Sequence, residues 1–217
     1  LLAVIIGNGT NYGLYGMANI SDRASDQLKG IQANYLRPET LNNANDVINN
    51  SVARLAIFKH YNIQEDLIHA SADGQKFESR LETFKTRYSS KYFGTNKGVS
   101  AITLIANHAA LNAKVIGSNE HESHYIFDLL QSNTSEIQPD VLSTDTHGVN
   151  HVNFALLDLF GYTFAPRYAQ FGKVIEEMFK VSENKDQAVT LSLKQPIKTD
   201  LIIEHWDTIQ RIAISLQ

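Results

Sequence analysis

The spacing of apolar residues changes near residue 66, and this change constrains the fold more than any other feature of the sequence. Within residues 1–60, apolar side chains recur every three or four positions, most clearly in the stretch behind Thr40, a residue type that often caps a helix. Beyond this point, short apolar runs alternate with polar or glycine-containing turns, which is typical of strands. We therefore expect a helical segment over residues 1–60 and a strand-containing core over residues 61–217.

The order of elements within this core indicates the fold class. Three successive strand-like runs predict a meander, and a helix, a strand, a second helix and a last strand are expected to follow it. This order predicts an α/β fold with a mixed sheet flanked by helices, rather than a strictly alternating parallel sheet. The expected elements are strands at 67–70, 101–106 and 113–116, a helix capped by Asn119, a strand from Val141 that ends at Asp145, a helix that closes at Gly161, and a strand at 162–164.

Composition excludes several classes of function. The 217 residues include no cysteine, which excludes a disulfide framework, a thiolate zinc site and a cysteine nucleophile. The formal net charge is −4, so the chain is not basic throughout and any DNA contact must be local. The apolar run Leu1–Ile6 is too short for a membrane span, and no basic region precedes it, so neither a membrane anchor nor a signal peptide is expected.

Two aspartates stand where strands are expected to end. Asp73 comes just after the first expected strand and Asp145 ends the fourth, 72 residues later. That separation is too long for a calcium loop, so a shared metal site requires assembly by the sheet. Magnesium prefers such oxygen ligands, and two ions about 4 Å apart can hold both oxygens of a phosphoryl transfer. By pattern alone, however, the simpler interpretation is that Asp145 caps a helix and Asp73 opens a turn with Gly74.

The sequence around the two aspartates favours the metal site. Four stretches, LLAVIIGNGTNYGLYGMA, SADGQKF, STDTHGVNHVNFALLDLFGYTFAPR and EHWDTIQRIAISL, closely resemble the catalytic region of the replicative Tn-three-type transposases, a family of DDE enzymes. The resemblance extends from Leu1 to Gln217 and implies a ribonuclease-H-like fold. It also implies that Asp73 and Asp145 are the first two acids of the catalytic triad.

The third acid that the resemblance implies is a glutamate in a later helix, within an asparagine-lysine-glycine-glutamate type of motif that this sequence lacks. The chain offers Glu176, Glu177, Glu183 and Glu204, and none fits, since Glu204 lies in a tryptophan-containing segment that the family places upstream of its glutamate. The apolar helical stripe over residues 202–216 is unfinished at the end of the chain. We therefore expect a C-terminally incomplete core that binds divalent metal weakly and does not cleave DNA by itself.

For the complete protein, the resemblance implies replicative transposition. Hydrolysis at the transposon ends exposes 3′ hydroxyls, and these attack target DNA to give a cointegrate. Asp73 and Asp145 are expected to hold Mg²⁺ or Mn²⁺, with two ions in the complete site. The implied partners are transposon-end DNA, target DNA and further copies of the full-length protein, as a homodimer or larger assembly. The implied location is the bacterial cytoplasm, on the nucleoid when the protein is bound to DNA, without membrane association.

A basic and aromatic segment follows Asp73. Residues 76–97 contain six basic and two acidic side chains interleaved with aromatic ones, which favours contact with phosphates and unpaired bases. A solvated hairpin with one packed face explains the pattern equally well. His147 and Arg167 are weaker candidates, with a polar neighbour of a helix start and a structural ion pair as their simpler interpretations. The candidate DNA contacts are Lys76, Arg80, Lys85, Arg87, His147 and Arg167.

Two alternative functions remain at this point. One is a non-catalytic transposase remnant that binds DNA or full-length transposase without cleaving. The other is a nucleotide-binding module built on the glycines between Gly7 and Gly16, although Tyr12 stands where a G-x-G-x-x-G turn requires glycine. His121 and His124 are three residues apart, so they do not form the H-E-x-x-H zinc pattern.

Overall fold

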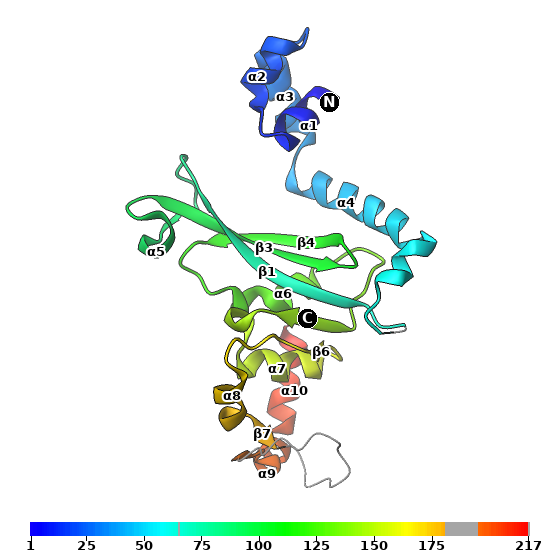
Figure 1. The fold of residues 1–217 in the computed structure, drawn as a ribbon, viewed down its shortest axis with the longest axis vertical. Coiled ribbons are helices and arrows are strands. Elements are labelled where there is room, and N and C mark those ends of the chain that lie inside the picture. The colour runs from blue at the N-terminus through cyan, green and yellow to red at the C-terminus, as the bar shows by residue number, and fades with distance from the viewer. Residues whose placement is uncertain (65, 181–194, 217) are drawn as a thin grey trace. The chain divides into compact units, whose positions relative to one another are not determined.

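The computed structural model describes residues 1–64, 66–180 and 195–216 (Figure 1). The chain divides into two compact units. The first comprises Leu1–Leu55 together with Thr134–Glu136, and the second comprises Ala56–Asn133 together with Ile137–Gln217. The boundary between the helical segment and the core therefore lies a few residues before the expected position at residue 60.

The first unit is helical, as the apolar spacing predicts. Its first three helices pack around a small core formed by Val4, Met17 and Leu28. Gly7 permits this packing, because a Cβ atom there would lie 2.6 Å from Cγ of Met17. The helices are α1 (Leu2–Gly9), α2 (Gly13–Ile20), α3 (Ser25–Tyr35) and α4 (Pro38–Ala53).

Two sequence-based interpretations of this unit are wrong. The apolar run at the start of the chain forms α1 rather than the strand that a dinucleotide-binding turn requires, so the nucleotide-binding interpretation fails. Thr40 does not cap α4, because Pro38 occupies the beginning of the helix behind the N-cap Arg37. Proline suits this position, since its fixed φ and missing N–H cost nothing in the first turn. Arg54, just after α4, forms a 3.0 Å ion pair with Glu136 of the same unit.

The second unit is built on a six-stranded mixed sheet with the order β2-β3-β1-β5-β6, in which β4 also pairs with β3. The strands β1, β3 and β4 form the expected antiparallel meander, while β5 and β6 run parallel to β1. This sheet confirms the predicted α/β fold with a mixed sheet. The strands are β1 (His69–Glu78), β2 (Arg87–Tyr88), β3 (Lys97–Ala106), β4 (Ala109–Gly117), β5 (Val141–Thr144) and β6 (Thr163–Phe164).

Helices cover one face of the sheet, and Figure 1 shows α6 and α7 there. The core between them contains Leu104, Leu129 and Leu142, all inaccessible to solvent. Asn119 does not cap a helix as predicted, because the turn from Gly117 to Glu120 occupies that position. The helical elements of this unit up to α7 are η1 (Ala56–Tyr61), α5 (Ser90–Phe93), η2 (Glu122–Tyr125), α6 (Ile126–Gln131), η3 (Thr146–Gly148) and α7 (His151–Leu159).

The described remainder of the chain is made of short elements. The expected C-terminal helix is interrupted at His205, and Trp206, which follows the break, is 42% exposed. Among the described helices, none combines the length and apolar character that crossing a membrane requires. The elements are α8 (Phe171–Val174), η4 (Ile175–Glu177), β7 (Phe179–Lys180), β8 (Gln195–Pro196), α9 (Thr199–Glu204) and α10 (Trp206–Ser215).

Candidate functional site

Asp73 lies inside β1 rather than after it, so the predicted turn at Asp73 and Gly74 is wrong. Pairing between β1 and β3 continues without a break through Asp73, which lies opposite Thr103. Ladder pairing over this length overrides the local turn preference of an Asp-Gly sequence. Gly74 fits the strand because Glu122 packs against it, and a Cβ atom at Gly74 would lie 2.1 Å from the carboxyl carbon of Glu122.

The parallel register of β1 and β5 places Asp145 beside Asp73. Ala72 pairs with Thr144 at the end of this ladder, so Asp73 and Asp145 each directly follow its last paired residue. Adjacent strands lie about 4.8 Å apart, and side chains at paired positions share a face of the sheet. Both aspartates are exposed. The sheet therefore brings two aspartates that are distant in the sequence to the same end of two neighbouring strands.

A hydrogen-bond chain ties the same strands together on this face. Nε2 of His69 lies 2.7 Å from Oγ of Ser143, and Ser143 donates its hydroxyl hydrogen to the carbonyl oxygen of Ala165, at 2.6 Å. Because that hydrogen is already used, Nε2 of His69 is the donor in the first bond. The chain joins β1, β5 and the segment after β6 shortly before the strands reach the aspartate pair.

One carboxylate oxygen of each aspartate accepts a hydrogen bond from a nearby backbone N–H. Oδ1 of Asp73 accepts from the backbone N–H of Gly74 at 2.8 Å, and Oδ1 of Asp145 accepts from that of His147 at 2.9 Å. Asp145 thereby caps η3, whereas α7 is capped by Asn150. Within the described residues, no hydrogen bond to Oδ2 of either aspartate is found. Capping by Oδ1 is compatible with cation binding by Oδ2.

A buried polar support underlies both aspartates. The side-chain amide of Asn153, 5% exposed, donates to the carbonyl oxygens of Gly148 at 3.1 Å and Ser123 at 2.9 Å. It thus joins the turn that carries Asp145 to η2, whose Glu122 packs beneath Gly74. We did not predict this support from the sequence, although the Asn150 and Asn153 spacing was visible there as a helix-start signal.

Arg167 lies next to the turn that Asp145 begins. Its backbone N–H donates to the carbonyl oxygen of Thr144 at 2.8 Å, so the chain after β6 continues alongside β5. The hydroxyl of Thr146 donates to the carbonyl oxygen of Arg167 at 3.2 Å. Arg167 and His147 are both exposed. The two aspartates and Arg167 therefore come from three neighbouring segments of one sheet.

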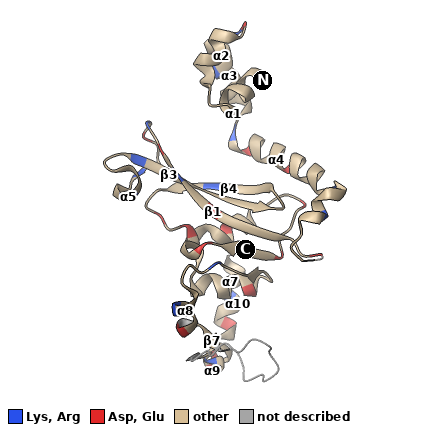
Figure 2. Cartoon of the chain, in the orientation of Figure 1, with Lys and Arg blue, Asp and Glu red and all other residues tan. Residues whose placement is uncertain are grey.

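The basic candidates Arg80, Lys85 and Arg87 lie beyond the end of β1. Figure 2 shows Lys and Arg at the end of the sheet where α5 lies. All three side chains are exposed; Nζ of Lys85 donates to the carbonyl oxygen of Val115 at 2.6 Å, and Arg87 donates to that of Phe84 at 2.8 Å. The hydrogen bond from Lys97 to Glu82 raises the pKa of the Lys97 amine.

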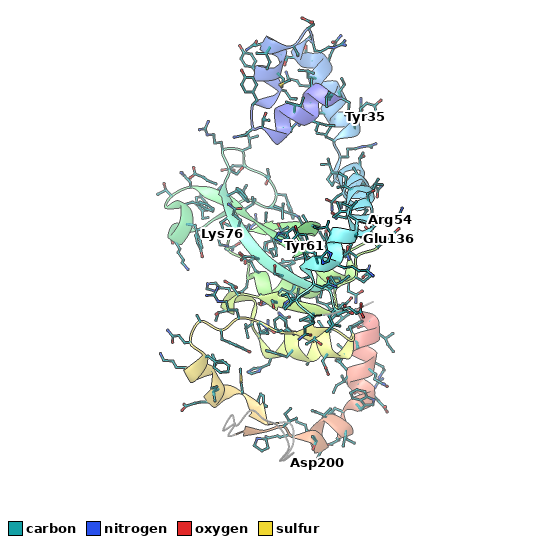
Figure 3. All side chains as sticks on the ribbon, turned by 45° about the vertical axis from the view of Figure 1, so that its right-hand side comes forward. Tyr35, Arg54, Tyr61, Lys76, Glu136 and Asp200 are labelled. Carbon is teal, nitrogen blue, oxygen red and sulfur yellow. The ribbon has the colours of Figure 1, made fainter. Side chains whose placement is uncertain are left out.

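Lys76, labelled in Figure 3, differs from these candidates, because the burial pattern of β1 assigns it to the covered face, opposite to Asp73. Its Nζ lies 3.7 Å from Oε1 of Glu122 and donates to the carbonyl oxygen of Ser118 at 3.2 Å. The side chain is only 16% exposed. Lys76 therefore supports the covered face of β1 and is not grouped with the exposed basic side chains.

Three of the four glutamates considered for the third acid lie in short elements of the described C-terminal part of the chain. Glu176 and Glu204 are exposed on η4 and at the end of α9, Glu177 lies in η4, and Glu183 falls outside the described residues. Within residues 1–64, 66–180 and 195–216, no group of three acidic or histidine side chains is arranged to hold a metal ion. The described part of the site consists of two carboxylates.

Comparison with known sequences gives the family. The profile of the Tn3 transposase DDE domain matches residues 1–217. The chain belongs to this family. Among Tn3-family relatives, it is 27% identical to the transposase for transposon gamma-delta of Escherichia coli K12 and 31% identical to the transposase for transposon Tn2501 of Escherichia coli. It is 26% identical to the transposase for transposon Tn4556 of Streptomyces fradiae.

These matches cover all of the chain but only 22% of the first two Tn3-family transposases and 24% of the third. The chain therefore spans less than a quarter of the length of these relatives. A likeness to the crystal structure of the Mos1 Strand Transfer Complex is weak, with 8% sequence identity and a TM-score of 0.31 over 89% of this chain and 65% of that one.

Proposed function

We propose that this chain is part of the catalytic domain of a DNA transposase that cuts transposon ends and joins them to target DNA. The observation that carries the proposal is the parallel register of β1 and β5, which sets Asp73 beside Asp145 on an exposed face. Family membership gives this pair of acids its chemical meaning. In the complete protein, we propose that the pair works with a third carboxylate supplied from outside this sequence.

The proposed reaction has two phosphoryl-transfer steps. In the first, water attacks a phosphorus at the transposon end, the bond from phosphorus to the 3′ oxygen breaks, and a 3′ hydroxyl is released. In the second, that hydroxyl attacks a target phosphodiester, forms a new phosphorus–oxygen bond and displaces a 3′ hydroxyl of the target. The first step therefore consumes one water and one phosphodiester bond, whereas the second exchanges one phosphodiester bond for another.

The two carboxylates suit a hard divalent cation such as Mg²⁺ or Mn²⁺, because ionised carboxylate oxygens are its preferred protein ligands. Asp73 and Asp145 would hold it, and when bound, up to two such ions would stabilise the charge that develops on the reacting phosphate. Capping of η3 by Asp145 and support of β1 by Glu122 orient the two carboxylates before the cation arrives. The exposed face leaves room for a DNA strand.

We expect the complete transposase to nick a transposon-end duplex with Mg²⁺ or Mn²⁺ and to lose this activity in EDTA, because two carboxylates alone cannot stabilise the transferring phosphoryl group. Residues 1–217 by themselves should bind Mn²⁺ weakly and leave the duplex intact. Gel analysis of nicked strands and titration of Mn²⁺ by calorimetry test both parts. Robust nicking by residues 1–217 would contradict the need for an external third acid, and no nicking by the complete protein would favour a non-catalytic remnant that only binds DNA.

We also propose that DNA reaches the site over Arg80, Lys85 and Arg87, with Arg167 and His147 near the acids. Replacing Arg80 and Lys85 by glutamate should weaken binding of the complete protein and make it less dependent on salt, because each lost phosphate contact lowers the logarithmic salt slope by about 0.9. Fluorescence anisotropy titrations at salt concentrations between roughly 50 and 200 mM measure the DNA affinity and its salt slope. Lys173→Glu, on the exposed surface of α8, is the matched control. An unchanged slope in the double variant would remove this segment from the DNA interface.

The proposed partners extend to the whole protein. We propose that it acts as a homodimer or larger assembly, because two transposon ends must be cut and joined to one target. Its proposed location is the bacterial cytoplasm, on the nucleoid when it is bound to DNA.

A further inference from the structure

The loop between β1 and β2 presents two large apolar side chains to solvent. Phe84 is 89% exposed and Leu81 is 76% exposed. Neither side chain contributes to the core of its unit. Exposed apolar side chains that lie close together in the sequence can mark an interaction site, so the residues around this loop bear on its role.

Side-chain hydrogen bonds stabilise the backbone of the loop that carries these two side chains. Thr86 is buried, and its hydroxyl donates to the carbonyl oxygen of Thr83 at 2.9 Å and accepts from the N–H of the same residue at 3.0 Å. The carbonyl oxygen of Leu81 accepts from the hydroxyl of Ser79 at 2.7 Å, and that of Phe84 accepts from Arg87. The backbone behind both apolar side chains is therefore fixed by side-chain hydrogen bonds, so little ordering remains to be done on binding.

The charge around the two apolar side chains favours a nucleic acid as the partner. Residues 79–97 contain five basic side chains and one acidic side chain, within a chain whose formal net charge is −4. Lysines also lie over aromatic rings here, Lys97 over Tyr88 at 4.7 Å and Lys91 over Tyr92 at 5.0 Å. Cations flanking an exposed apolar pair match a duplex, whose phosphates lie outside and whose stacked bases lie inside.

The length of β1 sets the distance between Asp73 and the loop that follows this strand. Asp73, Gln75 and Phe77 share the exposed face of β1, which leads from the acids towards the loop. A strand rises about 3.3 Å per residue, so Glu78 at the end of β1 lies roughly 17 Å from Asp73. Duplex DNA rises about 3.4 Å per base pair, so this distance corresponds to about five base pairs.

We propose that Leu81 and Phe84 form an apolar wedge that inserts between base pairs of the transposon-end duplex, at a step about five or more base pairs from the reacting phosphate. The flanking cations hold the two strands, and the wedge keeps one step unstacked. This proposal rests on the proposed function, because it places the duplex over Asp73 and Asp145. It adds a contact that distorts DNA at a distance from the chemistry.

The test uses the complete transposase and transposon-end duplexes with 2-aminopurine at successive positions. Because unstacking relieves the quenching of 2-aminopurine, the fluorescence should rise on binding at one or two positions about five to eight base pairs from the cleaved phosphate. The variant Leu81→Ala/Phe84→Ala should lose most of this rise, at least about fivefold, while its salt slope stays unchanged. Phe84→Trp, which keeps a large flat side chain, should retain it.

Two controls make the result specific. Ile63→Ala removes another exposed apolar side chain of the same unit and should leave the fluorescence rise intact. The Arg80→Glu/Lys85→Glu variant should weaken binding and lower the salt slope, and at saturating protein it should still give the rise. A mismatch at the unstacked step should tighten binding of the unchanged protein several-fold, about fivefold or more, and should do so less for the wedge variant.

The outcomes separate this proposal from the function on which it rests. If the unchanged protein nicks the duplex with Mg²⁺ but no 2-aminopurine position brightens, the wedge is wrong and the proposed function stands. The wedge is equally wrong if the rise persists in Leu81→Ala/Phe84→Ala, since other residues then cause the unstacking. If the unchanged protein neither binds nor nicks the duplex, both proposals fail.

Discussion

Replacing either Asp73 or Asp145 by asparagine should abolish strand cleavage by the complete transposase. Asparagine has the same shape and can still accept the backbone hydrogen bond that Oδ1 of each aspartate accepts. It lacks the negative charge that a divalent cation requires. We expect each variant to lose at least about a thousandfold in cleavage rate, which corresponds to about 4 kcal/mol of transition-state stabilisation.

The fold should tolerate both substitutions, because the two side chains are exposed. The free energy of unfolding should change by less than about 0.5 kcal/mol. Single-turnover cleavage assays and calorimetric Mn²⁺ titrations measure the two functions, and Asp158→Asn on α7 is the matched control, since it removes another exposed carboxylate of the same unit. Retention of more than about a tenth of the cleavage rate by Asp73→Asn would exclude Asp73 as a ligand.

The order of elements could be predicted from the sequence because apolar spacing reports which side of a helix or strand is buried. The meander, the strand before Asp145 and the helix after it follow this rule. The prediction of a turn at Asp73 and Gly74 is wrong because the pairing that decides the structure there is not local. The local sequence favours a turn, but the partner that continues the strand is β3, about thirty residues further along the chain. Pairing between distant segments leaves no local signal.

The candidate site divides in the same way. Asp73 and Asp145 could be named from the stretches of sequence around them, but their adjacency depends on the register of β1 and β5. The contacts that support them also cross between elements: Asn153 reaches two turns, and Glu122 packs beneath Gly74. Lys76 illustrates the converse, since this basic residue near a candidate catalytic acid points to the opposite face by the alternation of the strand.

Gly148 shows how closely the turn of Asp145 packs against the strand before it. A Cβ atom at Gly148 would lie 2.4 Å from Oγ1 and 2.5 Å from Cβ of Thr144. Thr144 is buried beneath the turn, and its Cβ is fixed by the backbone of β5, so it cannot move aside. Any side chain at Gly148 therefore displaces the turn, and with it the carboxylate that Asp145 presents beside Asp73.

Gly148→Ala should consequently damage stability and activity together. Overpacking of this kind costs about 1–3 kcal/mol in the free energy of unfolding, which denaturant titration followed by circular dichroism measures. A displacement of about 1 Å at a reacting group lowers cleavage roughly a hundredfold. Gly172→Ala on α8 is the matched control, because nothing lies within 4 Å of its Cβ position. The double variant Thr144→Ala/Gly148→Ala removes Oγ1 from the clash and should recover part of the cleavage rate. Wild-type stability and cleavage in Gly148→Ala would instead show that the turn of Asp145 accommodates a methyl group at this position. The position of the Asp145 carboxylate would then not depend on the packing of this turn against β5.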